Sequence, residues 1–309
     1  MELAFTPVFI GGSGRSGTTI LLNLLSRHPD FHGSMPREIK YLTSRYGLID
    51  IALNRPLAIE ENVRGIRNNL AARILPSVGV KNLNRFEERI HGSWWSEIGK
   101  KGNQRGLIQG ISRDQLDYEL ERFNRSFRKN RIAAARGLFE SLSLAQMQTG
   151  AKRYFGDSTP VNIMQSDLIF RLLPESKFIS VVRDGRDVSA SVVRENWGPD
   201  EHFAALDWWA NRIKTGRKAF QKIPEKNRLE IRIENLVIHH REETFAKLLD
   251  FLDLPSHSSV DDYFDQEVLP ERLNAGRWRD EPIDTAEFEV KYNAILENLS
   301  SQGIVIDKI

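Results

Sequence analysis

The chain has no cysteine among its 309 residues. Without thiols it can form no disulfide, no thiolate nucleophile and no zinc site with cysteine ligands, which suits a reducing compartment. Its seven histidines show no HExxH-like spacing. The sequence therefore predicts a protein that holds no metal ion.

Long hydrophobic runs are also missing. No window approaches the roughly 18 consecutive apolar residues that a membrane helix needs. Only a few residues precede the first strand-like run, Pro7 to Ile10, so no signal peptide fits. The expected location is cytoplasmic, with no transmembrane segment.

The composition is that of a globular protein, with 40% apolar residues and a net charge of +2. This length and composition suit one large α/β domain over residues 1–309. The basic residues are unevenly spread, which leaves two interpretations open, a solvated helix face or a surface for an anionic substrate. They crowd one stretch at Arg122, Arg125, Arg128, Lys129, Arg131 and Arg136.

Two segments have a strand, a turn and a helix in succession. The first runs from Val8 through a glycine-rich turn to Leu25, and the second from Lys177 to Val193. Two such units predict a three-layer α/β fold, a parallel sheet covered by helices. Further strands are expected at 153–156 and 229–233, and helices at 161–173, 201–220, 242–252 and 285–299.

The turn of the first unit has the GxxxxG spacing of a phosphate-binding loop, from Gly12 to Gly17. A strand that delivers such a turn into a helix N-terminus brings free backbone N–H groups and the positive end of the helix dipole together. An ATP-binding loop would continue with lysine, whereas Thr18 follows here and the cation, Arg15, lies inside the loop. The loop therefore favours an anion other than a magnesium-bound triphosphate, unless the glycines only make a tight turn.

A second anion site is predicted where the other unit turns. Arg183 ends an apolar strand, and Ser191 follows eight positions later, about two turns into the next helix. A guanidinium and a hydroxyl placed in this way can bind one phosphate from two sides. Local pairing of Arg183 with Asp187 is the alternative.

These segments, GxGRSGTT and VVRDGRDVxxS, resemble the two motifs with which the sulfotransferase family binds 3'-phosphoadenosine 5'-phosphosulfate (PAPS). The resemblance implies a P-loop NTPase-like fold, PAPS as co-substrate, 3',5'-bisphosphoadenosine (PAP) as product and no metal. It implies that Arg183 and Ser191 bind the 3'-phosphate. It assigns the 5'-phosphosulfate to Gly14, Arg15, Ser16, Gly17, Thr18 and Thr19.

The segment Gly276-Arg277-Trp278-Arg279 is similar to the C-terminal segment that closes over the nucleotide in this family. Gly276 and Arg277 are therefore further candidates for the 3'-phosphate, followed by Arg272. The sequence departs from the family pattern at two other positions. Ser158 replaces a lysine often found near the sulfate, and Ile233 replaces an aromatic residue often found near the adenine.

The segment Arg37-Glu38-Ile39-Lys40-Tyr41-Leu42 resembles the Lys-Glu-x-His-Phe-Phe stretch of glycan sulfotransferases, in which the glutamate is the general base. The resemblance makes Glu38 the base and Arg37 its flanking cation. Lys40 stands where the pattern has histidine and is expected to contact sulfate or acceptor, while Arg15 stabilises the leaving group. Alternatively, Glu38 and Lys40 are surface charges at a helix start.

The predicted function is transfer of a sulfuryl group from PAPS to a hydroxyl or amine of a carbohydrate, peptide or small-molecule acceptor. Residues from about 42 to 150 are charged, helical in pattern and poor in strand-like runs. We expect them to form a helical insertion that contributes to the acceptor site. No nucleic acid partner is expected. Two rivals stay open: a phosphate-loop kinase of small molecules, and a non-catalytic binder of nucleotides or polyanions.

Overall fold

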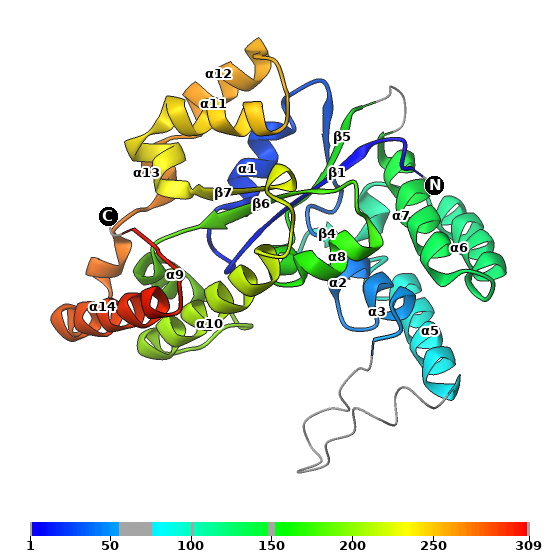
Figure 1. Cartoon of the computed structure of the whole chain (residues 1–309), viewed down its shortest axis with the longest axis horizontal. Coiled ribbons are helices and arrows are strands. Elements are labelled where there is room, and N and C mark those ends of the chain that lie inside the picture. Colours follow the sequence, from blue (N-terminus) through cyan, green and yellow to red (C-terminus); the bar gives the residue numbers. More distant parts are fainter. Residues whose placement is uncertain (1, 56–75, 100–101, 148–151, 308–309) are drawn as a thin grey trace. The chain divides into compact units, whose positions relative to one another are not determined.

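The computed structural model describes residues 2–55, 76–99, 102–147 and 152–307 (Figure 1). The chain forms two compact units, each described here by itself. The first takes residues 1–6, 34–155 and 168–175, and the second takes 7–33, 156–167 and 176–309. The segment 42–150, predicted to be a helical insertion, lies in the first unit, and its residues 56–75, 100–101 and 148–150 lie outside the described residues.

A five-stranded sheet has the order β2-β5-β1-β6-β7. Strand β6 pairs in parallel with both β1 and β7. In the β1–β6 register Gly12 lies opposite Val181, so the carboxyl ends of these two strands meet at one edge of the sheet. The strands are β1 (Thr6–Gly12), β2 (Phe31–Gly33), β5 (Tyr154–Asp157), β6 (Lys177–Val182) and β7 (Arg228–Arg232).

Helices cover both faces of the sheet in the second unit, which explains why β1 and β6 are almost continuously apolar and buried. In Figure 1, α1 (Thr18–Leu25), α11 (Arg241–Phe251) and α12 (Ser258–Glu267) lie on one side. On the other side lie α9 (Gly185–Val192), α10 (His202–Phe220) and α14 (Thr285–Ser301). Their core contains Val182, Trp209 and Phe288. The predicted α/β fold with a largely parallel sheet is confirmed.

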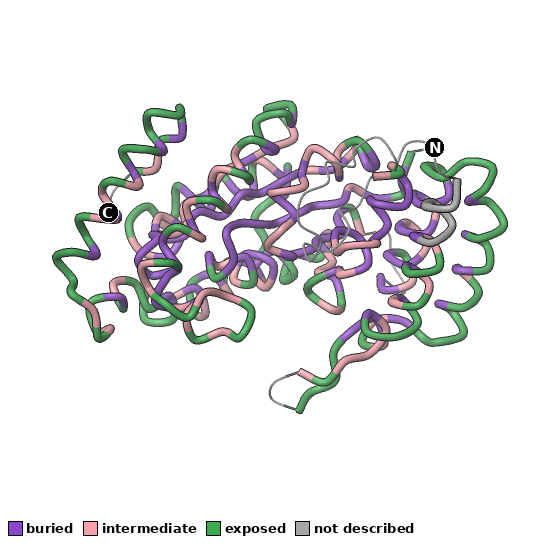
Figure 2. Tube along the Cα trace, turned by 90° about the horizontal axis from the view of Figure 1, so that it is seen from below, coloured by how far each residue is buried: buried purple, intermediate pink, exposed green. Residues whose placement is uncertain are grey.

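The described part of the first unit is mainly helical. Leu116, Leu120, Phe123 and Phe127 recur every three or four residues along α6 and are buried, so in Figure 2 this helix alternates purple and green. Its helices are α2 (Lys40–Thr43), α3 (Leu48–Ala52), α5 (Pro76–His91), η1 (Leu107–Gln109), α6 (Arg113–Phe127) and α7 (Arg131–Met147). The strands β3 (Glu97–Ile98) and β4 (Gln104–Arg105) form an antiparallel hairpin.

Several expected elements differ in detail. The helix expected at 161–173 is a 3₁₀ segment, η2 (Pro160–Gln165), followed by α8 (Ser166–Leu172). The hairpin β3–β4 and the helix α12 were not predicted. The remaining short elements are η3 (Glu225–Asn227), η4 (Asn235–His239), α13 (Pro270–Leu273) and η5 (Arg277–Asp280). Over the described ranges, none of the helices is both long and apolar enough to cross a membrane.

Candidate functional site

The glycine-rich loop joins β1 to the N-terminus of α1. Gly14 and Gly17 have φ angles of 88° and 98°, in the left-handed region that glycine adopts without steric cost. Arg15 between them also has a positive φ, 56°. A non-glycine residue held there costs on the order of 1–3 kcal/mol. The surrounding contacts therefore hold the Arg15 backbone in a conformation that is unfavourable in isolation.

The two predicted anion-binding motifs meet in the second unit. Arg15 Nε donates to Ser191 Oγ at 2.8 Å, and Arg183 Nη1 donates to the Arg15 carbonyl oxygen at 3.1 Å. Arg15 also lies 3.7 Å from a carboxylate oxygen of Glu195. The parallel pairing of β1 with β6 explains the meeting, because it brings the residues after both strands to the same edge.

The Arg183 side chain is held by backbone carbonyls. Besides the Arg15 carbonyl, its Nη2 donates to the Leu273 carbonyl oxygen at 2.7 Å. Burial lowers the pKa of Arg183, while Asp187 and Glu234 act in the opposite direction. The expected alternative, local pairing with Asp187, is not the main contact, because that carboxylate accepts hydrogen bonds from elsewhere.

Asp187 holds the segment in which Gly276 and Arg277 lie. Its two carboxylate oxygens accept hydrogen bonds from the backbone N–H groups of Gly276 at 2.9 Å and Trp278 at 3.4 Å. Burial raises the pKa of Asp187, and these bonds work against that rise. Arg277 is exposed, and the exposed Arg272 pairs with Glu267. Asp187 thus joins α9 to the C-terminal segment.

Buried polar atoms that lack hydrogen-bond partners among the described residues occur at this edge, and Ser16 Oγ and Arg183 Nε are among them. A buried donor without a partner is costly, and a bound anion removes that cost. Gly12 makes room for the serine, since a Cβ at Gly12 would lie 2.3 Å from Ser16 Oγ. The loop therefore has unused capacity for an anionic ligand.

A third cation, Arg212 of α10, supports the loop from another direction. Its Nε donates to the Ser13 carbonyl oxygen at 2.5 Å, and its guanidinium lies 4.6 Å from the centre of the Trp208 ring. Burial lowers the pKa of Arg212 to about 10, so it is still charged at neutral pH. The rings of Trp208 and Trp197 flank Gly14, where an added Cβ would lie 3.4 Å and 3.6 Å from them. Sequence reasoning missed Arg212, because only the fold brings α10 to the loop.

The candidate base and its neighbours belong to the first unit, whereas the loop residues belong to the second. Glu38 and Arg37 are exposed, and Lys40 starts α2. The Lys40 ammonium pairs with Glu97 of β3. The ammonium of Lys40 therefore already has a carboxylate partner, a constraint on any contact that it makes with sulfate or acceptor.

Comparison with known proteins identifies the family of the chain. The model of the sulfotransferase family matches residues 7–62 and 66–258, well over half of the chain. The chain belongs to the sulfotransferase family. The match covers both strand-turn-helix units and ends before Gly276.

The individual proteins that this chain matches are distant from it. It is 21% identical over 258 residues to a protein-tyrosine sulfotransferase of Drosophila melanogaster, an alignment that covers 82% of this chain and 39% of the fly protein. Among solved structures, the sulfotransferase domain of the Synechococcus PCC 7002 olefin synthase matches with a TM-score of 0.54 and 15% identity, over 100% and 98% of the two chains. The sulfotransferase domain from the curacin biosynthetic pathway matches at 0.52 and 14%, over 97% and 99%. The two structures share the fold.

The sequence contained a signal for some of these contacts but not for others. Asp187 stands within the motif that identified Arg183, so its place near the site could have been inferred. Glu234, which accepts the Asp184 N–H at 2.7 Å, and Arg212 carry no such signal. No group of three or more histidine, aspartate or glutamate side chains suited to hold a metal occurs in the part of the chain that the structure describes.

Proposed function

We propose that this protein transfers the sulfuryl group of PAPS to a hydroxyl group of an acceptor, with Glu38 as the general base. The observation that carries the proposal is the convergence of Arg15, Ser191 and Arg183 at one sheet edge. PAPS is an extended ligand with an anionic group at each end. Two anion sites that share contacts fit such a ligand better than a single phosphate loop does.

The residues of the loop fit the phosphosulfate end. The backbone N–H groups at the start of α1 and the Arg15 guanidinium offer positive charge, and Ser16 Oγ is a buried hydroxyl without a partner among the described residues. Arg183 fits the 3'-phosphate, because its guanidinium donates to backbone carbonyls and its Nε has no hydrogen-bond partner among the described residues. Arg15 joins the two sites, because its Nε donates to Ser191 Oγ and its carbonyl oxygen accepts from Arg183.

In the proposed reaction Glu38 accepts the proton of the acceptor hydroxyl while that oxygen attacks sulfur. The bond between sulfur and the bridging oxygen of the phosphosulfate breaks in line with the attack, and PAP leaves. Arg15 and the loop N–H groups stabilise the negative charge that develops on the bridging oxygen. Positioning and electrostatics carry most of the catalysis in the related phosphoryl transfers. We further propose that residues of 42–150 contribute to the acceptor site.

The decisive experiment measures thermal stabilisation of the protein by PAP, in parallel with Mg-ATP, ADP and AMP. A ligand at about a hundred times its Kd adds roughly 2.7 kcal/mol to the free energy of unfolding. We expect PAP to stabilise the protein more than any other nucleotide. Arg183→Ala should weaken PAP binding at least tenfold, because it removes charge-assisted hydrogen bonds.

Arg194→Ala is the matched control. Arg194 follows α9, the helix that Arg183 precedes, but it pairs with Glu281 at 2.5 Å. PAP should stabilise this variant as it does the native protein. Stabilisation by Mg-ATP alone would identify a kinase. No response to any of the four nucleotides would contradict the proposal and favour a binder of other polyanions.

A further inference from the structure

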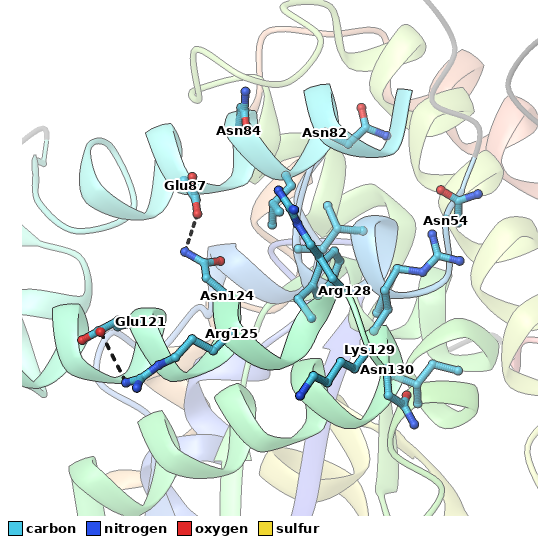
Figure 3. Close-up of a pocket in the computed structure, with 16 residues that line it drawn as sticks. Asn54, Asn82, Asn84, Glu87, Glu121, Asn124, Arg125, Arg128, Lys129 and Asn130 are labelled. Atoms are coloured by element: carbon cyan, nitrogen blue, oxygen red, sulfur yellow. Dashed lines mark hydrogen bonds and ion pairs between the residues drawn. The ribbon is translucent and has the colours of Figure 1, made fainter. Parts of the chain in front are cut away.

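A groove of about 1130 Å³ opens in the first unit, among α3, α5, α6 and the start of α7 (Figure 3). None of its lining residues belongs to the loop or to the second anion site. Its volume lies just above the range of small-molecule sites, roughly 300–1,000 Å³. The groove can therefore hold a ligand larger than a single metabolite.

The basic stretch of 122–136 divides into two sets in the structure. Arg122 and Arg125 pair with glutamates one turn away on α6, at 2.8 Å and 3.4 Å. Arg136 is buried and pairs with Glu175. The charges of these three arginines are therefore neutralised locally. For Arg122 and Arg125, this agrees with the interpretation of the basic stretch as a solvated helix face.

The other three cations, Arg128, Lys129 and Arg131, line the groove and have no acidic partner among the described residues. Figure 3 shows Arg128 between α5 and α6, and Lys129 beside it at the turn into α7. Asn130 Oδ1 accepts a hydrogen bond from the Ala133 N–H at 3.0 Å, as a helix cap does. The positive end of the α7 dipole therefore adds to the three side-chain charges.

Amide side chains line much of the rest of the groove. Each can donate and accept hydrogen bonds, as the binding of sugar hydroxyls requires. Asn124 donates to Glu87 at 2.5 Å, and Figure 3 shows this pair on the side of the groove near Arg125. The amides are Asn54, Asn82, Asn84, Asn124 and Asn130.

Buried Ile51, Ala52 and Phe127 give the groove an apolar base. Phe127 is the one aromatic residue among the described residues that line the groove, and it is 6% exposed. Sites for single-stranded nucleic acid combine cations with exposed aromatic side chains on which bases stack, and the described lining residues include no exposed aromatic side chain. Cations beside neutral amides instead suit a ligand that carries both acid groups and hydroxyls.

We infer that this groove binds an acidic oligosaccharide, with its carboxylate or sulfate groups at Arg128, Lys129 and Arg131 and its hydroxyls at the asparagine side chains. This binding site is separate from the proposed PAPS site in its residues. It does not depend on sulfuryl transfer, and its test needs no nucleotide.

The test measures binding of a heparin-derived hexasaccharide by isothermal titration calorimetry, without PAP. Lys129→Ala/Arg131→Ala should weaken binding at least tenfold. Arg122→Ala/Lys226→Ala is the control for net charge, because it also removes two positive charges, at a paired arginine and at an exposed lysine of η3. It should bind the hexasaccharide within about twofold of the native protein. Equal losses in the two variants, or none in the first, would overturn the site.

Two further probes test the ligand class. Asn84→Ala, an exposed amide on α5, should weaken hexasaccharide binding severalfold and leave binding of inorganic tripolyphosphate unchanged. Neutral maltohexaose should bind at least tenfold more weakly than the acidic hexasaccharide. If tripolyphosphate or a single-stranded DNA oligonucleotide binds the native protein as tightly as the hexasaccharide, the groove is a general polyanion site and the carbohydrate assignment is wrong. Circular dichroism of each variant checks that it is folded.

Discussion

The charge of a single side chain decides the chemistry proposed for Glu38. This residue is exposed, and a general base must be ionised when the acceptor binds. Glu38→Gln keeps the size and the hydrogen-bonding oxygen but cannot accept a proton. We expect turnover with PAPS to fall by about 10² or more, with PAP binding unchanged.

The measurement is steady-state sulfuryl transfer, paired with PAP-induced thermal stabilisation of the same sample. Lys40→Met removes the ammonium that pairs with Glu97, and we include it as a companion variant in the same two measurements. An active Glu38→Gln enzyme would refute the assignment of the base and would leave the nucleotide site untouched.

Glu234 accepts the backbone N–H of Asp184, the residue after Arg183. Its burial leads us to expect that the stability of the protein depends on pH. Glu234 is 2% exposed, and burial raises its pKa although the Asp184 N–H and Arg232 oppose the rise. The folded protein therefore holds this proton more tightly than the unfolded chain. The free energy of unfolding must fall as the pH rises from the ordinary value of 4.5 towards the raised one, by at most about 1.4 kcal/mol per pH unit.

Glu234→Gln removes this titration. The free energy of unfolding of the native protein minus that of the variant should therefore decrease as the pH rises through that window, in urea unfolding at a series of pH values. Glu297→Gln, an exposed carboxylate of α14, should give a difference that stays flat. A difference that grows with pH would mean that Arg232 lowers the pKa of Glu234 by more than burial raises it.

At the scale of an element, the turn from β1 into α1 depends on Gly17. Its φ of 98° disfavours any side chain, and an added Cβ would lie 2.8 Å from Ile233 Cγ1. Gly17→Ala should lower the free energy of unfolding by roughly 2 kcal/mol or more, from the left-handed backbone and from overpacking. Gly137→Ala is the matched control, because that site in α7 is open, and it should stabilise slightly.

A double-mutant cycle separates the two causes of the Gly17→Ala loss. In an Ile233→Ala background the steric part of the loss should disappear, giving a coupling energy on the order of 1 kcal/mol. Additive losses in urea unfolding would show that Ile233 does not restrict this position. The contact also explains why Ile233 is unsuited to the role of an aromatic residue beside adenine, since it is fully buried against the loop.

Local sequence predicted the elements that carry the site better than it predicted their neighbours. The apolar run before Gly12 and the periodic residues of α1 and α10 are local signals, and the structure has these elements. The strands β3 and β4 have two residues each, too few to give a period. The meeting of Arg15 with Ser191 followed from two strands of one parallel sheet. The contact of Arg212 with Ser13 depends on how α10 packs, which no local pattern encodes.

At the scale of the whole molecule, the proposed ligands divide between the two units. The loop, Arg183 and Gly276 belong to the second unit, while the groove with Arg128 and Lys129 belongs to the first. A ligand that binds the folded state protects the amides of the segments that it orders. Each ligand should therefore leave a distinct pattern of hydrogen exchange.

Hydrogen-exchange mass spectrometry of the native protein tests this division directly. PAP should slow exchange in peptides that cover 11–19, 183–191 and 273–278, and the acidic hexasaccharide should slow it in 82–91 and 124–135. Arg183→Ala should remove the first pattern and keep the second, whereas Lys129→Ala/Arg131→Ala should do the reverse. Protection by the hexasaccharide over 11–19 and 183–191 alone would mean that it competes for the nucleotide site, because its sulfates would then be binding the cations that we assign to PAPS.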